Sequence, residues 1–194
     1  GFVRCSPVSV TGTVNATFDP PWHLGNKEPP LAPEALATAP SCCVVGAGIS
    51  GASVAYALAR RGWQVTVLEA APHAAAGASG LPVGLVVPHV SADDSPRSRL
   101  SRVGAKLMLQ HCRNLLQGGE EWALSGVLEH RFSEGPDRLH HAAAWVKPAA
   151  LVRAWLQHPN ITVHYAKPVV QLQRNGDLWS LRGQDDSPLA EAKV

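Results

Sequence analysis

The sequence predicts an α/β fold, and the features that predict it lie in one continuous stretch. A short apolar run at residues 42–45 leads directly into the glycine pattern GAGISG at residues 46–51. A helical pattern follows, and a second β-rich run at residues 64–68 is closed by Glu69. This order of strand, glycines, helix, strand and acid is typical of a βαβ unit that binds a dinucleotide. We therefore expect a Rossmann-like parallel sheet.

Each glycine of the pattern has its own physical role. Gly46 allows the sharp turn from strand to helix, and Gly48 lets the backbone approach a pyrophosphate. Gly51 lets the helix pack closely against the sheet. The first turn of the helix presents unpaired N–H groups and a partial positive charge to the phosphates. The residues expected to bind the cofactor here are Gly46, Ala47, Gly48, Ile49, Ser50 and Gly51.

The acid that closes the second strand indicates which dinucleotide fits. A carboxylate at Glu69, followed by Ala70, can accept hydrogen bonds from ribose hydroxyls. It disfavours a 2′-phosphate, so FAD or NAD is favoured over NADP. The alternative is an ordinary βαβ unit with a tight turn and no bound dinucleotide.

Composition limits the other classes of protein. The chain has 194 residues, 45% of them hydrophobic, which fits one substantial globular domain. The net charge of +2 is too small to indicate nucleic-acid binding by itself. No apolar run reaches membrane-spanning length and no signal pattern opens the chain, so we expect a cytoplasmic protein. The cysteines lack metal-ligand spacing, so we expect no metal and free thiols at Cys5, Cys42, Cys43 and Cys112.

The chain divides by composition. Residues 1–40 are proline-rich and are predicted to be a linker or a tail of a preceding domain, in which Pro21-Trp22 could anchor the segment. Residues 41–194 form the dinucleotide-binding domain, with 120–150 contributing to a substrate domain. The last residues look like the opening of another strand, so we expect an incomplete domain.

The remaining elements follow from periodicity and turn signals. A helix is expected over 95–117, with Leu100, Val103, Leu107 and His111 on one face and Arg99, Arg102 and Lys106 on another. Pro148 fits the first turn of a second helix that ends near His158. Strands are expected at 83–90, 127–132, 143–146 and 161–165, with an antiparallel pair at 169–173 and 178–182 around Asn175-Gly176.

Two further segments carry a family resemblance. They are GASGLPVG at residues 77–84, followed by Pro88, and WVKPAAL at residues 145–151. With the glycine pattern and Glu69, they resemble the D-amino-acid-oxidase-like family of FAD enzymes. Within that family the chain is most similar to the oxidoreductase half of bifunctional enzymes that modify the wobble uridine of tRNA.

The resemblance implies an activity and partners. FAD would take a hydride from the carbon next to a secondary amine, and water would hydrolyse the resulting imine. The reaction would remove the carboxymethyl group from 5-carboxymethylaminomethyl-(2-thio)uridine in tRNA. A methyltransferase domain that uses S-adenosylmethionine would lie upstream. The same resemblance implies that Ala78 and Ser79 approach the phosphates or the ribityl chain, that Gly84 passes the isoalloxazine, and that Val169 meets the adenine.

Other interpretations stay open. The chain could be a free-standing oxidase of glycine-type or sarcosine-type amines or of D-amino acids, or a non-catalytic cofactor-binding fragment. Ser79 could instead be a helix cap or turn hydroxyl, and Val169 a plain strand residue. No catalytic residue is assigned.

Two groups of polar residues are further candidates for a role. His89, close to the expected flavin, is the one histidine with a candidate role, whereas His140-His141 fits a polar loop or strand edge. A basic helix face could meet tRNA phosphates, although a solvated face is favoured because Asp93 and Asp94 lie beside it. That face comprises Arg97, Arg99, Arg102 and Lys106.

Overall fold

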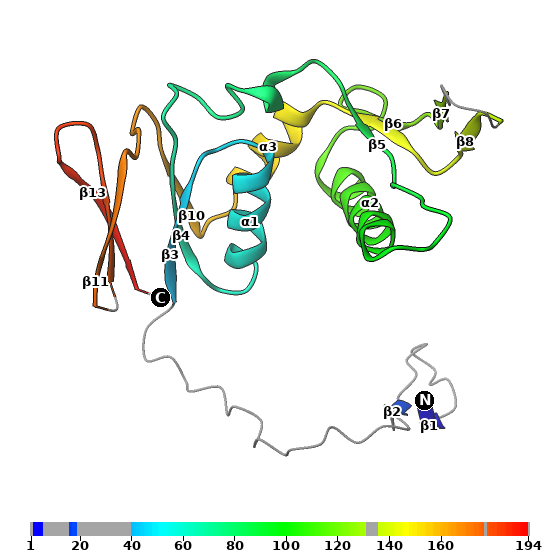
Figure 1. The fold of residues 1–194 in the computed structure, drawn as a ribbon, viewed down its shortest axis with the longest axis horizontal. Coiled ribbons are helices and arrows are strands. Elements are labelled where there is room, and N and C mark those ends of the chain that lie inside the picture. The colour runs from blue at the N-terminus through cyan, green and yellow to red at the C-terminus, as the bar shows by residue number, and fades with distance from the viewer. Residues whose placement is uncertain (1, 6–15, 19–39, 131–135, 177, 194) are drawn as a thin grey trace. The chain divides into compact units, whose positions relative to one another are not determined.

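The computed structural model describes residues 2–5, 16–18, 40–130, 136–176 and 178–193 (Figure 1). The chain separates into two units, residues 1–37 and 38–194. In the first unit, β1 (Phe2–Cys5) pairs antiparallel with β2 (Ala16–Phe18). The expected anchor at Pro21-Trp22 lies outside the described residues.

The second unit is built on a parallel sheet in the order β10-β4-β3. The predicted strand–helix–strand unit is confirmed, because β3 and β4 pair in parallel and are joined through α1. The third strand, β10, pairs in parallel with the other edge of β4. The bounds of these elements are Ser41–Val45 for β3, Ile49–Ala59 for α1, Gln64–Leu68 for β4 and Ile161–His164 for β10.

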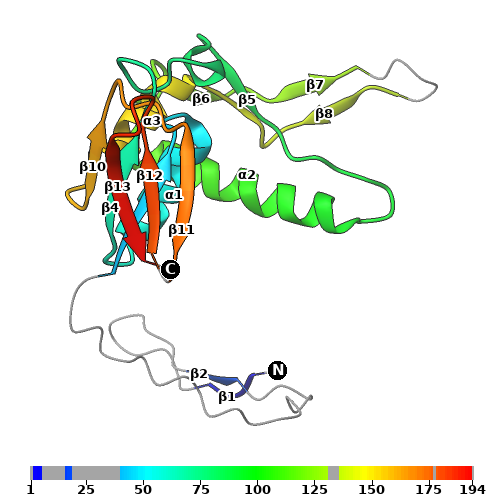
Figure 2. The same ribbon diagram turned by 60° about the vertical axis from the view of Figure 1, so that its left-hand side comes forward.

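Helices cover one face of this sheet and an antiparallel meander covers the other (Figures 1 and 2). α1 packs closely because its inward residues are the small side chains of Ala52, Ala55 and Ala59, all buried. Leu151 and Val152 of the helix α3 are completely buried in the same core. The covering elements are α3 (Pro148–Leu156), β11 (Gln171–Asn175), β12 (Leu178–Arg182) and β13 (Pro188–Lys193).

A second, antiparallel region follows β4 in the chain. Its three-stranded sheet has the order β5-β9-β6, and β7 and β8 form a separate antiparallel pair. The fold class predicted from the sequence, an α/β unit with antiparallel sheets beside it, is therefore confirmed. The elements are η1 (Ala78–Gly80), β5 (Gly84–Val86), α2 (Pro96–Leu115), β6 (Trp122–Leu124), β7 (Val127–Glu129), β8 (Arg138–His140) and β9 (Ala144–Val146).

The long helix α2 exposes the apolar face that the sequence predicts. Leu100 is 73% exposed, Val103 56% and Leu107 52%. The face that packs inward instead carries Ser98, Leu109 and Cys112. Periodicity identifies an apolar stripe, but packing decides which side of the helix is covered.

Some predicted bounds differ from the structure. β7 ends at Glu129, and residues 131 and 132 of the expected strand lie outside the described residues. β11 begins at Gln171, so Val169 precedes the strand in which it was expected. Cys42, Cys43 and Cys112 are free thiols. Within the described residues, no helix combines the length and apolarity needed to cross a membrane.

Candidate dinucleotide-binding site

The glycine turn between β3 and α1 has a backbone that requires glycine. Gly46 has a φ of +96°, and its N–H donates to the Leu68 carbonyl at 2.8 Å, which ties the turn to β4. A Cβ on Gly51 would lie 1.9 Å from the Gly46 carbonyl oxygen. Any side chain at position 51 would therefore force the helix away from the turn.

The start of α1 lacks a capping side chain of its own. Gly48 is the N-cap, no side chain caps the helix in the usual local way, and the first turn holds no acidic residue. The helix itself therefore supplies no side chain that offsets the partial positive charge of its N-terminus. The Ile49 N–H instead donates to Ser79 Oγ at 2.8 Å, from a loop 30 positions further along the chain. Ser79 lies inside η1 and thus supplies, from outside the helix, the acceptor for an N–H in the first turn of α1.

Glu69 lies directly beside this turn. Its Oε2 accepts the Ala47 N–H at 2.6 Å and its Oε1 accepts the Ala71 N–H at 2.8 Å. Both carboxylate oxygens are held by backbone donors, so the acid has one orientation at the end of β4. The Ala47 carbonyl also accepts the Ala75 N–H at 3.0 Å, which brings the following loop against the turn.

The loop that carries Ala78 and Ser79 is packed tightly. Ala75 has a φ of 57° and is only 4% exposed. A Cβ on Gly80 would lie 2.6 Å from the Ala75 carbonyl oxygen, so position 80 also requires glycine. Ser79 is 9% exposed, which leaves its hydroxyl at the edge of the turn.

The two remaining expected site residues, Gly84 and Val169, lie on other segments. Gly84 lies on β5, where a Cβ would meet Pro148 Cγ at 3.1 Å, so close packing against α3 explains this glycine. Val169 lies in the segment between β10 and β11. That segment runs beside Glu69, because the Lys167 N–H donates to the Glu69 carbonyl at 2.8 Å.

Sequence reasoning missed several contributors to the site. The N–H groups of Ala71, Ala75 and Lys167 hold the acid and its flanking loops, yet all three act through the backbone. Side-chain type gives no signal for such roles. Their positions follow only from the way the loops return to the turn.

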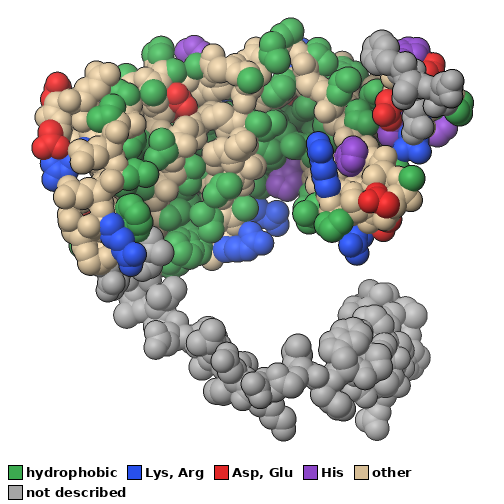
Figure 3. Space-filling view, in the orientation of Figure 1, with side chains coloured by type: hydrophobic (Ala, Val, Ile, Leu, Met, Phe, Trp, Pro, Cys, Tyr) green, Lys and Arg blue, Asp and Glu red, His purple; other side chains and the backbone are tan. Residues whose placement is uncertain are grey.

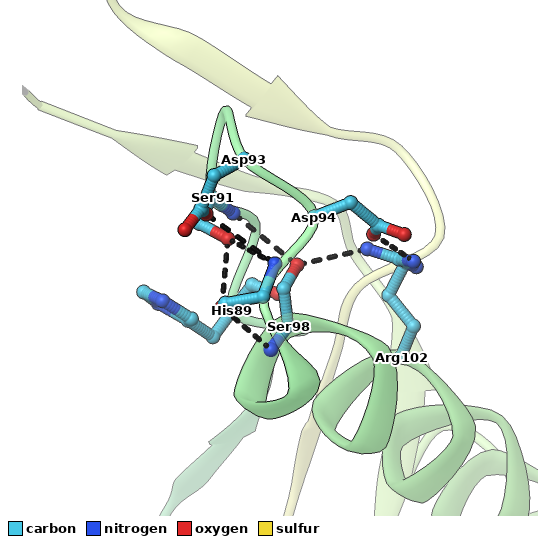
Figure 4. Close-up of polar contacts among 7 residues, drawn as sticks. His89, Ser91, Asp93, Asp94, Ser98 and Arg102 are labelled. Atoms are coloured by element: carbon cyan, nitrogen blue, oxygen red, sulfur yellow. Dashed lines mark hydrogen bonds and ion pairs between the residues drawn. The ribbon is translucent and has the colours of Figure 1, made fainter.

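His89 lies in a polar network at the start of α2 (Figure 4). Its N–H donates to Ser101 Oγ at 2.7 Å, and its carbonyl accepts the Ser98 hydroxyl at 3.1 Å. Its side chain is exposed. In the same network Arg102 pairs with Asp94 and donates to Ser98 Oγ at 2.8 Å. The backbone of His89 anchors the loop.

Acidic residues lie beside the basic face of α2 and beside His140. The hydroxyl of Ser91 lowers the pKa of Asp93, which keeps that carboxylate ionised beside the basic residues of α2. On β8, His140 Nε2 lies 2.7 Å from Glu129 Oε2. His140 is therefore a nearly buried strand residue with an acidic partner, in agreement with the strand-edge interpretation.

The donors at the turn suit a dinucleotide. A glycine turn without side chains, the first turn of α1 and a neighbouring hydroxyl fit a pyrophosphate. A carboxylate fixed at the end of the second strand fits ribose hydroxyls. Among the described residues, no group of three or more His, Cys, Asp or Glu side chains is arranged to hold a metal.

The parallel βαβ unit and its glycine turn define a protein of the dinucleotide-binding α/β class. A family model described as FAD dependent oxidoreductase matches residues 41–147, more than half of the chain. The chain belongs to this family.

Relatives with close sequence similarity share a single description. The MnmC protein of Albidiferax ferrireducens, described as a tRNA 5-methylaminomethyl-2-thiouridine biosynthesis bifunctional protein, is 52% identical over 192 residues. That match covers 97% of this chain and 31% of the relative. The MnmC of Polaromonas naphthalenivorans is 40% identical and covers 91% and 33%. The chain thus spans about a third of the length of these curated relatives.

Solved structures show the same fold at low sequence identity. Glycine oxidase from Geobacillus kaustophilus matches with a TM-score of 0.62 and 15% identity, over 78% of this chain and 52% of that one. L-amino acid deaminase from Proteus vulgaris matches with a TM-score of 0.60 and 13% identity, over 80% and 45%. These likenesses concern the fold.

Proposed function

We propose that this chain binds FAD at the glycine turn and is part of an enzyme that modifies tRNA. The reaction would remove the carboxymethyl group from 5-carboxymethylaminomethyl-(2-thio)uridine at the wobble position. The observation that carries the proposal is the 52% identity to an MnmC protein over 97% of the chain. That relative's name supplies the tRNA substrate and the bifunctional organisation. A methyltransferase domain that uses S-adenosylmethionine would belong to the whole protein, which would act in the cytoplasm.

Each expected site residue has an assigned part in holding the cofactor. The turn from Gly46 to Gly51 would line the pyrophosphate. Glu69, with Ala70 beside it, would hold the adenosine ribose. Ala78 and Ser79 would lie along the phosphates or the ribityl chain. Gly84 would pass near the isoalloxazine and Val169 near the adenine.

The hydrogen bonds of the site support this assignment. Ser79 Oγ accepts the Ile49 N–H, so its own hydroxyl proton is free to be donated to a phosphate oxygen. Glu69 holds the Ala47 N–H with one oxygen and has lone pairs left for ribose hydroxyls. When bound, FAD would supply the hydride acceptor for the carbon next to the substrate amine. The protein's contribution at this site is binding and orientation.

The test begins with the visible absorption spectrum of the purified chain reconstituted with FAD. A flavin spectrum, with FAD released on denaturation, supports the cofactor assignment. The flavoprotein is then incubated anaerobically with tRNA that carries the carboxymethylaminomethyl group, with unmodified tRNA as the control. Bleaching of the flavin and release of glyoxylate with modified tRNA alone support the proposed reaction.

Other results would contradict the proposal in distinct ways. Reduction by glycine, sarcosine or a D-amino acid, without reduction by modified tRNA, would indicate a free-standing amine oxidase. A colourless protein that binds NAD in place of FAD would overturn the cofactor assignment. Binding of FAD without reduction by any amine would indicate a cofactor-binding fragment.

A further inference from the structure

A second polar pocket lies away from the glycine turn, between the C-terminal halves of α1 and α2. Its cavity volume is about 240 Å³. The side chains that line it include Tyr56 of α1, its C-cap Arg60, and Gln110, His111 and Asn114 of α2. It lies at the opposite end of α1 from the proposed pyrophosphate site, so the cofactor does not account for it.

The protonation of His111 is set by a neighbouring tryptophan. The indole N–H of Trp155 donates to His111 Nδ1 at 2.8 Å, and an indole nitrogen can only donate. The neutral imidazole must therefore carry its proton on Nε2. Burial, together with the nearby Arg60 cation, lowers the pKa of His111 and keeps the ring neutral at pH 7. His111 is thus a fixed N–H donor.

The other polar groups of the pocket can also donate. Arg60 carries a guanidinium, which lies over the Tyr56 ring with its Cζ 5.7 Å from the ring centroid. Gln110 and Asn114 carry amide N–H groups. Within the part of the chain that the structure describes, no carboxylate lies within ion-pair distance of Arg60.

Two further cations lie at the ends of these helices, since Arg61 directly follows the C-cap of α1 and Arg113 is in the last turn of α2. Cations near helix C-termini have an ordinary explanation, because they offset the helix dipole. Arg61 fits that explanation, since its Nη1 donates to the Ala57 carbonyl at 2.7 Å. Arg60 is directed instead over an aromatic ring at the pocket wall. Figure 3 shows Lys and Arg side chains on both sides of a hollow with a histidine recessed in it.

We propose that the pocket between α1 and α2 holds a phosphate group of the tRNA backbone. A pocket of N–H donors with an unpaired guanidinium matches a phosphate, whose oxygens only accept. The choice of tRNA as the source of this phosphate rests on the proposed function, in which tRNA is the substrate. The stacked aromatic wall behind the pocket, formed by Tyr56 and Trp155, keeps the donors in place.

The test measures binding of a fluorescein-labelled tRNA anticodon stem-loop by anisotropy between 50 and 200 mM salt. Arg60→Gln should weaken binding about tenfold and lower the slope of log K against log salt by about 0.7–0.9, as for one lost phosphate contact. Asn114→Asp, which puts a carboxylate in the lining of the pocket, should weaken binding of the stem-loop more than Arg60→Gln does. Arg97→Gln is the matched control, because it removes the same charge from an exposed position at the other end of α2.

A second measurement follows the His111 Nε2–H proton by NMR, first with inorganic phosphate and then with the stem-loop. A shift with the stem-loop alone, or with both ligands, supports the proposal. Equal losses for Arg60→Gln and Arg97→Gln overturn the pocket and leave tRNA as the substrate. A shift with inorganic phosphate but none with the stem-loop overturns the backbone source. Absence of stem-loop binding by the unaltered chain overturns both tRNA proposals, while FAD binding is judged separately by absorbance.

Discussion

Glu69 Oε2 accepts the Ala47 N–H at 2.6 Å, across 22 positions of sequence. The bond joins the acid at the end of β4 to the middle of the glycine turn. The two halves of the dinucleotide fingerprint therefore form one hydrogen-bonded unit before any ligand binds. In that arrangement, the turn is held by the same side chain that would receive a ribose.

Glu69→Gln should lower both stability and affinity for FAD. Two N–H donors face the carboxylate, and an amide offers one oxygen for them, so the other donor meets an NH₂ group. We expect a loss of about 1–3 kcal/mol in the free energy of unfolding and at least a tenfold weaker FAD affinity. Urea unfolding and flavin titration measure the two effects. Glu120→Gln, at an exposed position, should change neither.

Gly51→Ala and Gly104→Ala should act in opposite directions. At position 51 the new Cβ would meet the Gly46 carbonyl oxygen at 1.9 Å, so the helix must shift and unfolding becomes easier. At position 104, in the middle of α2, no atom lies within 4 Å of the new Cβ. There the better helix propensity of alanine should stabilise the protein by about 0.5–1 kcal/mol. Thermal unfolding of both variants checks the pair, and two equal shifts would contradict the geometry.

Ser79→Ala should destabilise the protein by about 0.5–2 kcal/mol, as loss of a helix cap does. The Ile49 N–H would lose its acceptor, and FAD would lose a hydroxyl at the edge of the turn. Ser53→Ala is the control, because the Ser53 hydroxyl only donates to the Ser50 carbonyl within the helix. Its unfolding midpoint should move little. Equal losses of stability in the two variants would contradict the capping role of Ser79.

Stability should fall as the pH drops below about 6.5, and His111 should be one cause. The pKa of His111 is lowered in the folded chain, so the unfolded chain binds a proton that the folded one does not. By linkage, the free energy of unfolding then rises with pH between the folded and unfolded pKa values and is fully restored above the unfolded one. The midpoint difference between pH 5.5 and 7.5 should be smaller in His111→Gln. An unchanged difference would count against this assignment.

Ser98→Ala should loosen the loop before α2. Ser98 is completely buried, and its oxygen accepts from the Ser91 N–H and Arg102 while its hydroxyl donates to the His89 carbonyl. Its removal should cost about 1–3 kcal/mol, because the buried partners lose their bonds. Asp94→Ala breaks only the exposed ion pair with Arg102 and should have a far smaller effect. Hydrogen exchange of residues 89–95 should rise only in the first variant.

The sequence predicted the βαβ unit well, since its glycines and periodicity are local signals. The three-residue strands β6 and β8 were not predicted, because they exist through pairing with β9 and β7. The apolar stripe of α2 was predicted, but its exposure was not, because exposure depends on tertiary packing. At the site, the residue pattern pointed to Glu69 and the family resemblance pointed to Ser79. Their backbone partners depend on how distant loops return to the turn.

The bond between Ile49 and Ser79 offers a way to measure ligand binding without a chromophore. Loop 70–80 closes onto the turn through this bond and through the Ala75 N–H bonded to the Ala47 carbonyl, so both can open together as one local unit. A ligand that binds only the closed form raises the free energy of opening by RT ln(1 + [L]/Kd). Saturation with the cofactor should therefore make loop 70–80 more resistant to cleavage by a protease.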